Sequence, residues 1–224
     1  MARRYTVNKL SLLRASLVGA VAVVATSVAF PAVSQANIIS YTLLSDHCTD
    51  GCGPQTGGFG TITLTDISGG VNVDIVLNNG NKFVNTGLDA TVAFDLLNNP
   101  TITATGFSNT NFSLLSGTAG SVHMDGTGFF DYGILQNTAQ GNAGAQPSPL
   151  SFNILGSGVT IGSFNDPNAN LQLFAVDIIS GTTGKTGAVD VSVPFPVVGA
   201  GLPGLVVACG ALLGLARRRR QKIA

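Results

Sequence analysis

The sequence of 224 residues contains no glutamate and no tryptophan, and it has only two histidines and three cysteines. Without glutamate, acid–base chemistry between paired carboxyl groups would have to rely on aspartate alone. The motifs G-x-S-x-G, H-E-x-x-H and the P-loop are also missing, which removes the usual sequence signs of several hydrolases and nucleotide-binding enzymes. We therefore expect a protein that is not an enzyme. A secreted hydrolase on a jelly-roll scaffold stays open, because a catalytic triad is assembled in space.

Basic residues are nearly missing from the long middle part of the chain. Nine of the eleven lie within the first fourteen or the last eight positions, and only Lys82 and Lys185 lie between. All eleven acidic residues are aspartates between Asp46 and Asp190, so this middle part has a net charge of −9. Such a surface repels nucleic acid and anionic lipid and can attract divalent cations. We expect no nucleic-acid partner.

The first 36 residues have the order of a secretory signal peptide. Four basic residues precede the apolar run Ala15–Phe30, and Pro31 follows it. Ser34 and Ala36 then occupy the −3 and −1 positions of a cleavage site. The pattern predicts export and cleavage after Ala36, with a retained N-terminal anchor as the alternative.

The other end of the chain has a membrane-length apolar segment. Residues 197–216 are twenty positions without a charge, which as a helix would span about 30 Å, the thickness of the hydrocarbon layer. A basic stop sequence follows, made of Arg217, Arg218, Arg219 and Arg220. Because basic residues stay on the cytoplasmic side, the pattern predicts a single transmembrane helix with its tail inside and the aspartate-rich domain outside. A buried core helix is the alternative.

The stretch "VPFPVVGAGLPGL" at the start of this apolar segment adds a third element to the helix and the arginines. A short proline-containing motif, a transmembrane helix and an arginine-rich end together resemble the PEP-CTERM sorting signal of Gram-negative bacteria. The resemblance covers residues 193–224, with the motif at Val193, Pro194, Phe195 and Pro196. It implies recognition and cleavage by an exosortase, a membrane-embedded protease, and a setting of exopolysaccharide or biofilm. Phe195 stands where the motif of the family has glutamate.

Between these two segments, residues 37–192 show the alternation of short β-strands. Polar and apolar residues alternate in 61–65, 71–77, 88–96, 101–105 and 150–155, and the more continuously apolar 171–179 predicts a central strand buried on both faces. Turn sequences separate these runs at 68–70, 78–81, 98–100 and 125–126. We expect roughly nine to eleven strands in an all-β domain, an antiparallel β-sandwich of jelly-roll or immunoglobulin-like type.

The stretch "DHCTDGC" at residues 46–52 combines two cysteines, a histidine and two aspartates, side chains that can form a disulfide or bind a metal ion. In an exported chain, Cys48 and Cys52 are expected to form a disulfide. A metal site using His47, Cys48, Asp50 and Cys52 is the alternative. No other cofactor is expected except Ca²⁺, for which Asp125 and Asp166 are candidate ligands because they lie in oxygen-rich turns.

The aromatic residues bear on sugar binding. The predicted domain offers Tyr41 and Tyr132 as platforms, and Phe129 and Phe130 should point to opposite faces of a strand. We expect an exported, non-catalytic envelope or matrix protein, anchored in the inner membrane as a precursor and finally at the outer envelope, the cell surface or outside the cell. A Ca²⁺-dependent glycan-binding module is the alternative.

Overall fold

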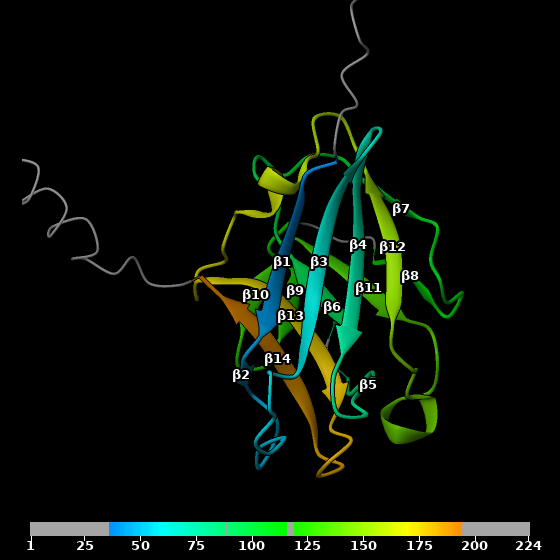
Figure 1. The fold of residues 1–224 in the computed structure, drawn as a ribbon, viewed down its shortest axis with the longest axis vertical. Coiled ribbons are helices and arrows are strands. Elements are labelled where there is room, and N and C mark those ends of the chain that lie inside the picture. The colour runs from blue at the N-terminus through cyan, green and yellow to red at the C-terminus, as the bar shows by residue number, and fades with distance from the viewer. Residues whose placement is uncertain (1–35, 88, 116–118, 194–224) are drawn as a thin grey trace, which may run out of the picture. The chain divides into compact units, whose positions relative to one another are not determined.

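The computed structural model describes residues 36–87, 89–115 and 119–193 (Figure 1). The predicted transmembrane helix and basic tail, most of the signal peptide, and Ser34, Pro194, Phe195 and Pro196 lie outside these ranges. The described part contains fourteen strands and two short 3₁₀ turns, η1 (Gly141–Gly144) and η2 (Ile161–Phe164), without an α-helix. None of its helical segments is long and apolar enough to cross a membrane.

Five strands form sheet 1, which lies at the front in Figure 1. Their spatial order is β1 (Ile38–Leu43), β3 (Gly60–Ile67), β4 (Gly70–Leu77), β12 (Leu150–Leu155) and β7 (Thr103–Thr105), and every pair is antiparallel. The β3–β4 hairpin turns at the predicted site. Gly70 allows β4 to approach β12, because a Cβ atom at this position would overlap the Ile154 carbonyl oxygen.

Seven strands form sheet 2, behind sheet 1. Their order is β2 (Ser45–Asp46), β14 (Thr186–Ser192), β13 (Gln172–Ile179), β6 (Val92–Phe94), β11 (Tyr132–Gln136) and β8 (Phe112–Leu115), and β5 (Lys82–Phe83) also pairs with β13. All these pairs are antiparallel. Residues 173–178 of β13 are buried, which confirms the prediction of a central strand with both faces covered.

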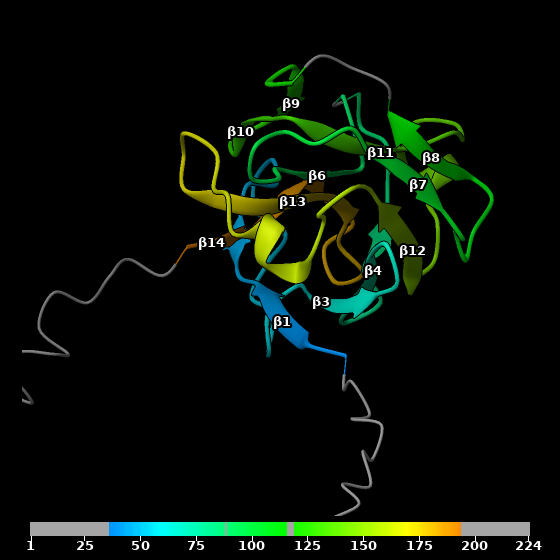
Figure 2. The same ribbon diagram turned by 90° about the horizontal axis from the view of Figure 1, so that it is seen from above.

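The chain crosses from one sheet to the other between β1 and β2. The Leu43 carbonyl accepts a hydrogen bond from Phe59 beside sheet 1, and the next amide, Leu44, donates to Asp190 in sheet 2. Figure 2 shows the sheets as two layers, with the hairpin of β9 (Val122–Met124) and β10 (Gly128–Phe130) on the outer side of sheet 2. The edge strands β7 and β8 lie at the opposite side from this crossing.

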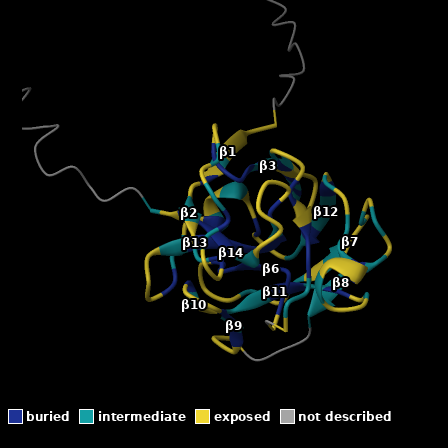
Figure 3. Ribbon diagram, turned by 90° about the horizontal axis from the view of Figure 1, so that it is seen from below, coloured by how far each residue is buried: buried dark blue, intermediate teal, exposed yellow. Residues whose placement is uncertain are grey.

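The core lies between the layers, as the dark blue interior of Figure 3 indicates. Side chains of alternate residues in β4, at positions 71, 73, 75 and 77, are buried there as predicted. Phenylalanines from both sheets fill the centre, including Phe94, Phe152 and Phe174. On the hairpin, Phe130 is fully buried and Phe129 is 59% exposed, which confirms that they point to opposite faces. The expectation of a mostly β protein with antiparallel sheets is confirmed, and the layers are consistent with an all-β sandwich.

The expected number of strands and two of their boundaries were wrong. Fourteen strands are described; several have three or four residues, and β2 and β5 have only two, too few to show any alternation. Of the expected runs 88–96 and 101–105, only Val92–Phe94 and Thr103–Thr105 are strands. After Phe94 the ladder ends because the Asp95 carboxylate, instead of a backbone carbonyl, accepts the hydrogen bond from the Asp131 amide.

Candidate functional site

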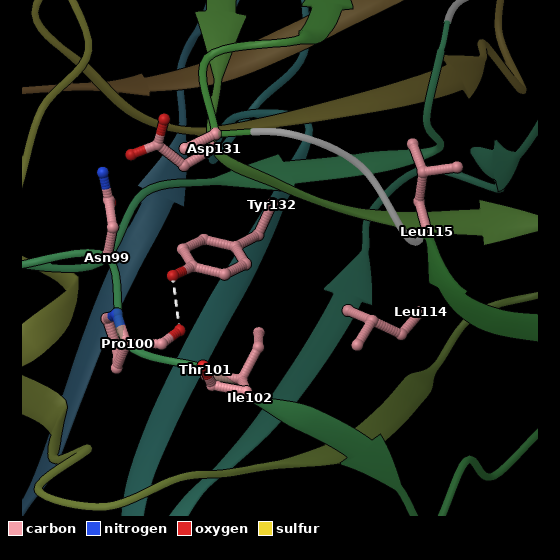
Figure 4. Close-up of a pocket in the computed structure, with 9 residues that line it drawn as sticks. Asn99, Pro100, Thr101, Ile102, Leu114, Leu115, Asp131 and Tyr132 are labelled. Carbon is pink, nitrogen blue, oxygen red and sulfur yellow. Dashed lines mark hydrogen bonds between the residues drawn. The ribbon is translucent and has the colours of Figure 1, made fainter.

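A shallow pocket of about 330 Å³ opens beside the edge strands β7 and β8 (Figure 4). Its walls come from three parts of the chain: the segment between β6 and β7, strand β8 with the residue after the gap, and the start of β11. The lining residues are Asn99, Pro100, Thr101, Ile102, Leu114, Leu115, Ala119, Asp131 and Tyr132. The volume is at the lower end of the range for small-molecule sites.

The turn before β7 shapes one wall of this pocket. Asn98 and Asn99 both have positive φ angles, 65° and 46°, a backbone conformation that asparagine adopts more readily than most residues. Pro100 follows with its fixed φ and keeps the chain extended into Thr101 and Ile102. This turn, which the sequence predicted at residues 98–100, therefore presents the Asn99 side chain at the pocket.

Tyr132 forms the aromatic part of the site. Its ring stacks on Phe94 with a centroid distance of 5.6 Å and an interplanar angle of 15°. Its hydroxyl donates a hydrogen bond of 2.6 Å to the Pro100 carbonyl oxygen, drawn as a dashed line in Figure 4. Burial and the carboxylates of Asp131 and Asp95 raise the pKa of the Tyr132 phenol. The ring is thus held from one side and one end, and its hydroxyl stays protonated at neutral pH.

Two aspartates meet at the end of the β6–β11 ladder, and one of them, Asp131, lines the pocket. Strands β6 and β11 pair Phe94 with Tyr132, so the next residues, Asp95 and Asp131, stand opposite each other where the ladder ends. Burial, together with the smaller effect of the negative charges of Asp131 and Asp166, raises the pKa of Asp95 to about 7 against the opposing effect of the hydrogen bond from the Asp131 amide. Asp95 is therefore about half protonated at neutral pH, and Asp131 is the acidic side chain that stands at the pocket itself.

Cys48 and Cys52, which were expected to pair, are joined by a disulfide in the structure. Both sulfur-bearing residues are buried, and the Asp46 carboxylate accepts hydrogen bonds from both of their amides, at 2.9 and 2.8 Å. The small loop packs closely on β14, since a Cβ atom at Gly187 would overlap the backbone of Cys48. The loop is thus part of the folded core at this end of sheet 2.

His47 belongs to a separate polar network on the outer side of sheet 2. Its Nε2 lies 2.6 Å from the carboxylate of Asp190, whose side chain is fully buried. The same carboxylate accepts a hydrogen bond from Ser192, which contacts Ser45. The other ring nitrogen faces Gly126, where a Cβ atom would lie 2.7 Å away. His47 therefore contacts both strand β14, through Asp190, and the β9–β10 hairpin, at Gly126.

The candidate metal ligands lie in three parts of the structure: the 46–52 loop, the β9–β10 turn and the segment after η2. Within the described ranges, one group of three such residues has its ligand atoms within 4.8 Å of one another, namely Asp46, Cys48 and Cys52. The disulfide uses both thiols, so this set lacks thiolate ligands. Asp125 lies in the β9–β10 turn, 3.6 Å from His123 Nδ1, whereas Asp166 lies after η2 and acts on Asp95. The two aspartates proposed as Ca²⁺ ligands thus have different neighbours.

Two residues at the limits of the described part belong to the predicted processing sites. Ala36, the last residue of the predicted signal peptide, is exposed and is separated from β1 by the single residue Asn37. Val193, the first residue of the predicted sorting motif, directly follows β14, packs against the core and donates a backbone hydrogen bond to Leu171. The remaining motif and basic residues lie outside the described ranges.

The comparisons with known proteins give no further information on this site. No family model, no curated protein and no solved structure matches the chain.

Asp95, Asp131 and Asn99 were not recognised as site residues in the sequence. They are up to 36 positions apart, and the pairing of β6 with β11 brings the two aspartates together. The sequence offers Tyr132 and Tyr41 as candidate sugar platforms. The structure places Tyr132 at the pocket, whereas Tyr41 packs on Phe174 with ring centroids 5.9 Å apart. The asparagine–proline turn was the one local signal for the pocket.

Proposed function

We propose that the chain is an exported, non-catalytic protein of the cell envelope or extracellular matrix, sorted by its C-terminal segment. The two-sheet domain would be a β-sandwich of jelly-roll or immunoglobulin-like type, preceded by a cleaved signal peptide and followed by a single transmembrane helix. The observation that carries this proposal is the segregation of charge. Nine basic residues flank a middle part with a net charge of −9, and basic residues do not cross the membrane readily.

The end of the described domain supports this division of the chain. Strand β14 ends at Ser192, and the motif that resembles a sorting signal begins at the next residue. Cleavage near Pro194–Pro196 would therefore leave every strand of the two sheets intact. An exosortase-type protease would be the processing partner, exopolysaccharide the matrix, and the mature protein would lie at the outer envelope, the cell surface or outside the cell.

Mass spectrometry of the C-terminus of the mature protein tests this proposal. In cells that contain the processing protease, we expect the chain to end near residue 196, and in cells without it the membrane-bound precursor should end at Ala224. A mature, exported protein that still ends at Ala224 in both strains would replace sorting with simple membrane anchoring.

A glycan-binding role is the second candidate, and the pocket beside Tyr132 favours it. An aromatic ring, an apolar wall and a carboxylate with an amide at one end are the groups that bind a sugar ring with one apolar face and a hydroxylated edge. Glycan arrays probed with and without EDTA separate Ca²⁺-dependent binding from binding by the side chains alone. No signal under either condition would count against this role.

A further inference from the structure

We propose that the pocket beside Tyr132 binds an amino sugar with a free amine, as a unit of a polysaccharide. This inference names a ligand class for the glycan-binding role and rests on that role, but it does not depend on sorting or processing. It follows from three observations: the sign of the charge at the pocket, the position of the apolar wall, and the fixed position of the Tyr132 ring.

The charge at the pocket selects the sign of the ligand. Asp131 lines the pocket and is the acidic side chain there, whereas the raised pKa of the neighbouring Asp95 makes that carboxyl group neutral at mildly acidic pH. Among the described residues that line the pocket there is no lysine, arginine or histidine. A sulfate, phosphate or uronic acid would thus be repelled by Asp131, whereas a protonated amine would replace part of its lost hydration by an ion pair with Asp131.

The apolar wall selects a ring over a flexible chain. Ile102, Leu114 and the ring of Tyr132 line the side away from the carboxylate, while Asn99 and Asp131 stand together at the other side in Figure 4. A sugar ring can lay its C–H face on this wall and direct its amine to Asp131. Its hydroxyl groups can use the Asn99 side chain and Thr101, which a lysine side chain could not use in the same way.

The aromatic platform is already fixed before any ligand binds. Stacking on Phe94 and the hydrogen bond to Pro100 hold the Tyr132 ring in place. A ligand therefore does not have to order this side chain, and the entropic cost of binding falls. The pocket lies at the β7–β8 side, away from the strand crossing at Leu43–Ser45.

Binding of defined oligosaccharides to the full-length protein in detergent tests the proposal. The probe is a tetramer of glucosamine, measured by calorimetry at a mildly acidic pH at which the amine is protonated. Its fully N-acetylated counterpart and a neutral glucose tetramer serve as matched ligands. We expect saturable binding of the glucosamine tetramer, at least tenfold tighter than binding of either neutral tetramer, and weakened by salt.

Two aspartate variants locate the binding site. Asp131→Asn keeps the shape of the side chain and removes its charge, and we expect it to weaken binding at least tenfold. Asp74→Asn makes the same change on the outer face of sheet 1, in β4, and should leave binding unchanged. Melting curves of both variants show whether the fold is kept. If Asp131→Asn does not fold, Asn99→Ala at the exposed turn provides the second test and should weaken binding severalfold.

Several results would overturn the proposal. Equal affinity for the acetylated tetramer would show that the amine is not recognised, and equal loss in Asp131→Asn and Asp74→Asn would mean general charge attraction. Tighter binding of a lysine tetrapeptide than of the glucosamine tetramer would identify a peptide site instead. All these measurements use purified protein, so a negative result would contradict the ligand proposal and leave the sorting proposal untouched. Conversely, a protein that binds the glucosamine tetramer but keeps its C-terminal tail in cells would support the ligand proposal and contradict the sorting proposal.

Discussion

Asp177 in β13 is a fully buried carboxyl group with an incomplete set of partners. The backbone amide and the hydroxyl of Thr86 donate hydrogen bonds to its Oδ2, at 2.8 and 2.7 Å, whereas its Oδ1 is buried without a partner. Burial raises the pKa of Asp177 to about 7, against the effect of the two Thr86 hydrogen bonds, and the charge of Asp125 adds to the increase. The folded state therefore favours the protonated, neutral form of Asp177 over the charged form.

This group makes stability depend on pH in a defined direction. The folded state binds the Asp177 proton more tightly than the unfolded chain does, so the stabilisation is complete below about pH 4 and is lost as the pH rises through about 7. Urea unfolding should show higher stability at pH 5 than at pH 8. Asp177→Asn should raise the unfolding free energy at pH 8 by roughly 2–4 kcal/mol, while Asp74→Asn should not. A wild-type protein more stable at pH 8 than at pH 5 would contradict this account.

The disulfide offers a second test on individual residues. Because Cys48 and Cys52 are only four positions apart, closing this loop restricts the unfolded chain little. Replacing both cysteines by alanine should cost about 2 kcal/mol in the unfolding free energy. The variant should remain folded in reducing and non-reducing buffer alike, as judged by its circular dichroism. Complete unfolding would mean that the loop contributes much more than chain entropy.

The β9–β10 hairpin is an element held by packing rather than by a ladder to its neighbours. It forms a two-stranded sheet of its own, and its buried side chains Val122, Met124 and Phe130 pack on alanines of sheet 2 at positions 93, 175 and 188. The small alanines leave the space that these larger side chains fill. The hairpin therefore depends on a few large residues.

Neighbouring phenylalanines in this hairpin give a matched pair of variants. Phe130 is fully buried and Phe129 is 59% exposed. Phe130→Ala should lower the unfolding free energy by about 3–5 kcal/mol, the usual cost of a large cavity, and Phe129→Ala should lower it by less than about 1 kcal/mol. Chemical unfolding of both proteins is the measurement, and similar losses in the two would show that the hairpin is not packed as described.

The sequence predicted those elements whose pattern is local. Alternation located β3, β4 and β12, and the continuous apolar run located β13, because the side chains themselves report which faces are buried. The two-residue strands β2 and β5 exist only because longer strands lie beside them. Asp95 and Asp131 become a pair only through the register of β6 and β11, so the candidate pocket could not be predicted from spacing along the chain.

Basic and acidic residues are segregated along the whole chain. Its acidic residues all belong to the middle part of the chain, and the arginines stand behind an apolar segment of membrane length. Within the described ranges, the strands end at Ser192, directly before the proposed sorting segment. This order would let the domain fold outside the cytoplasm while the tail still holds the precursor at the membrane.

A pair of reporters tests this orientation most directly. Green fluorescent protein, which fluoresces in the cytoplasm, and alkaline phosphatase, which is active only outside it, are each fused behind Ala224, and protease is added to intact spheroplasts. The account predicts fluorescence, no phosphatase activity, and digestion of the aspartate-rich domain from the outside. An active phosphatase behind Ala224, or a domain protected inside the spheroplasts, would contradict it.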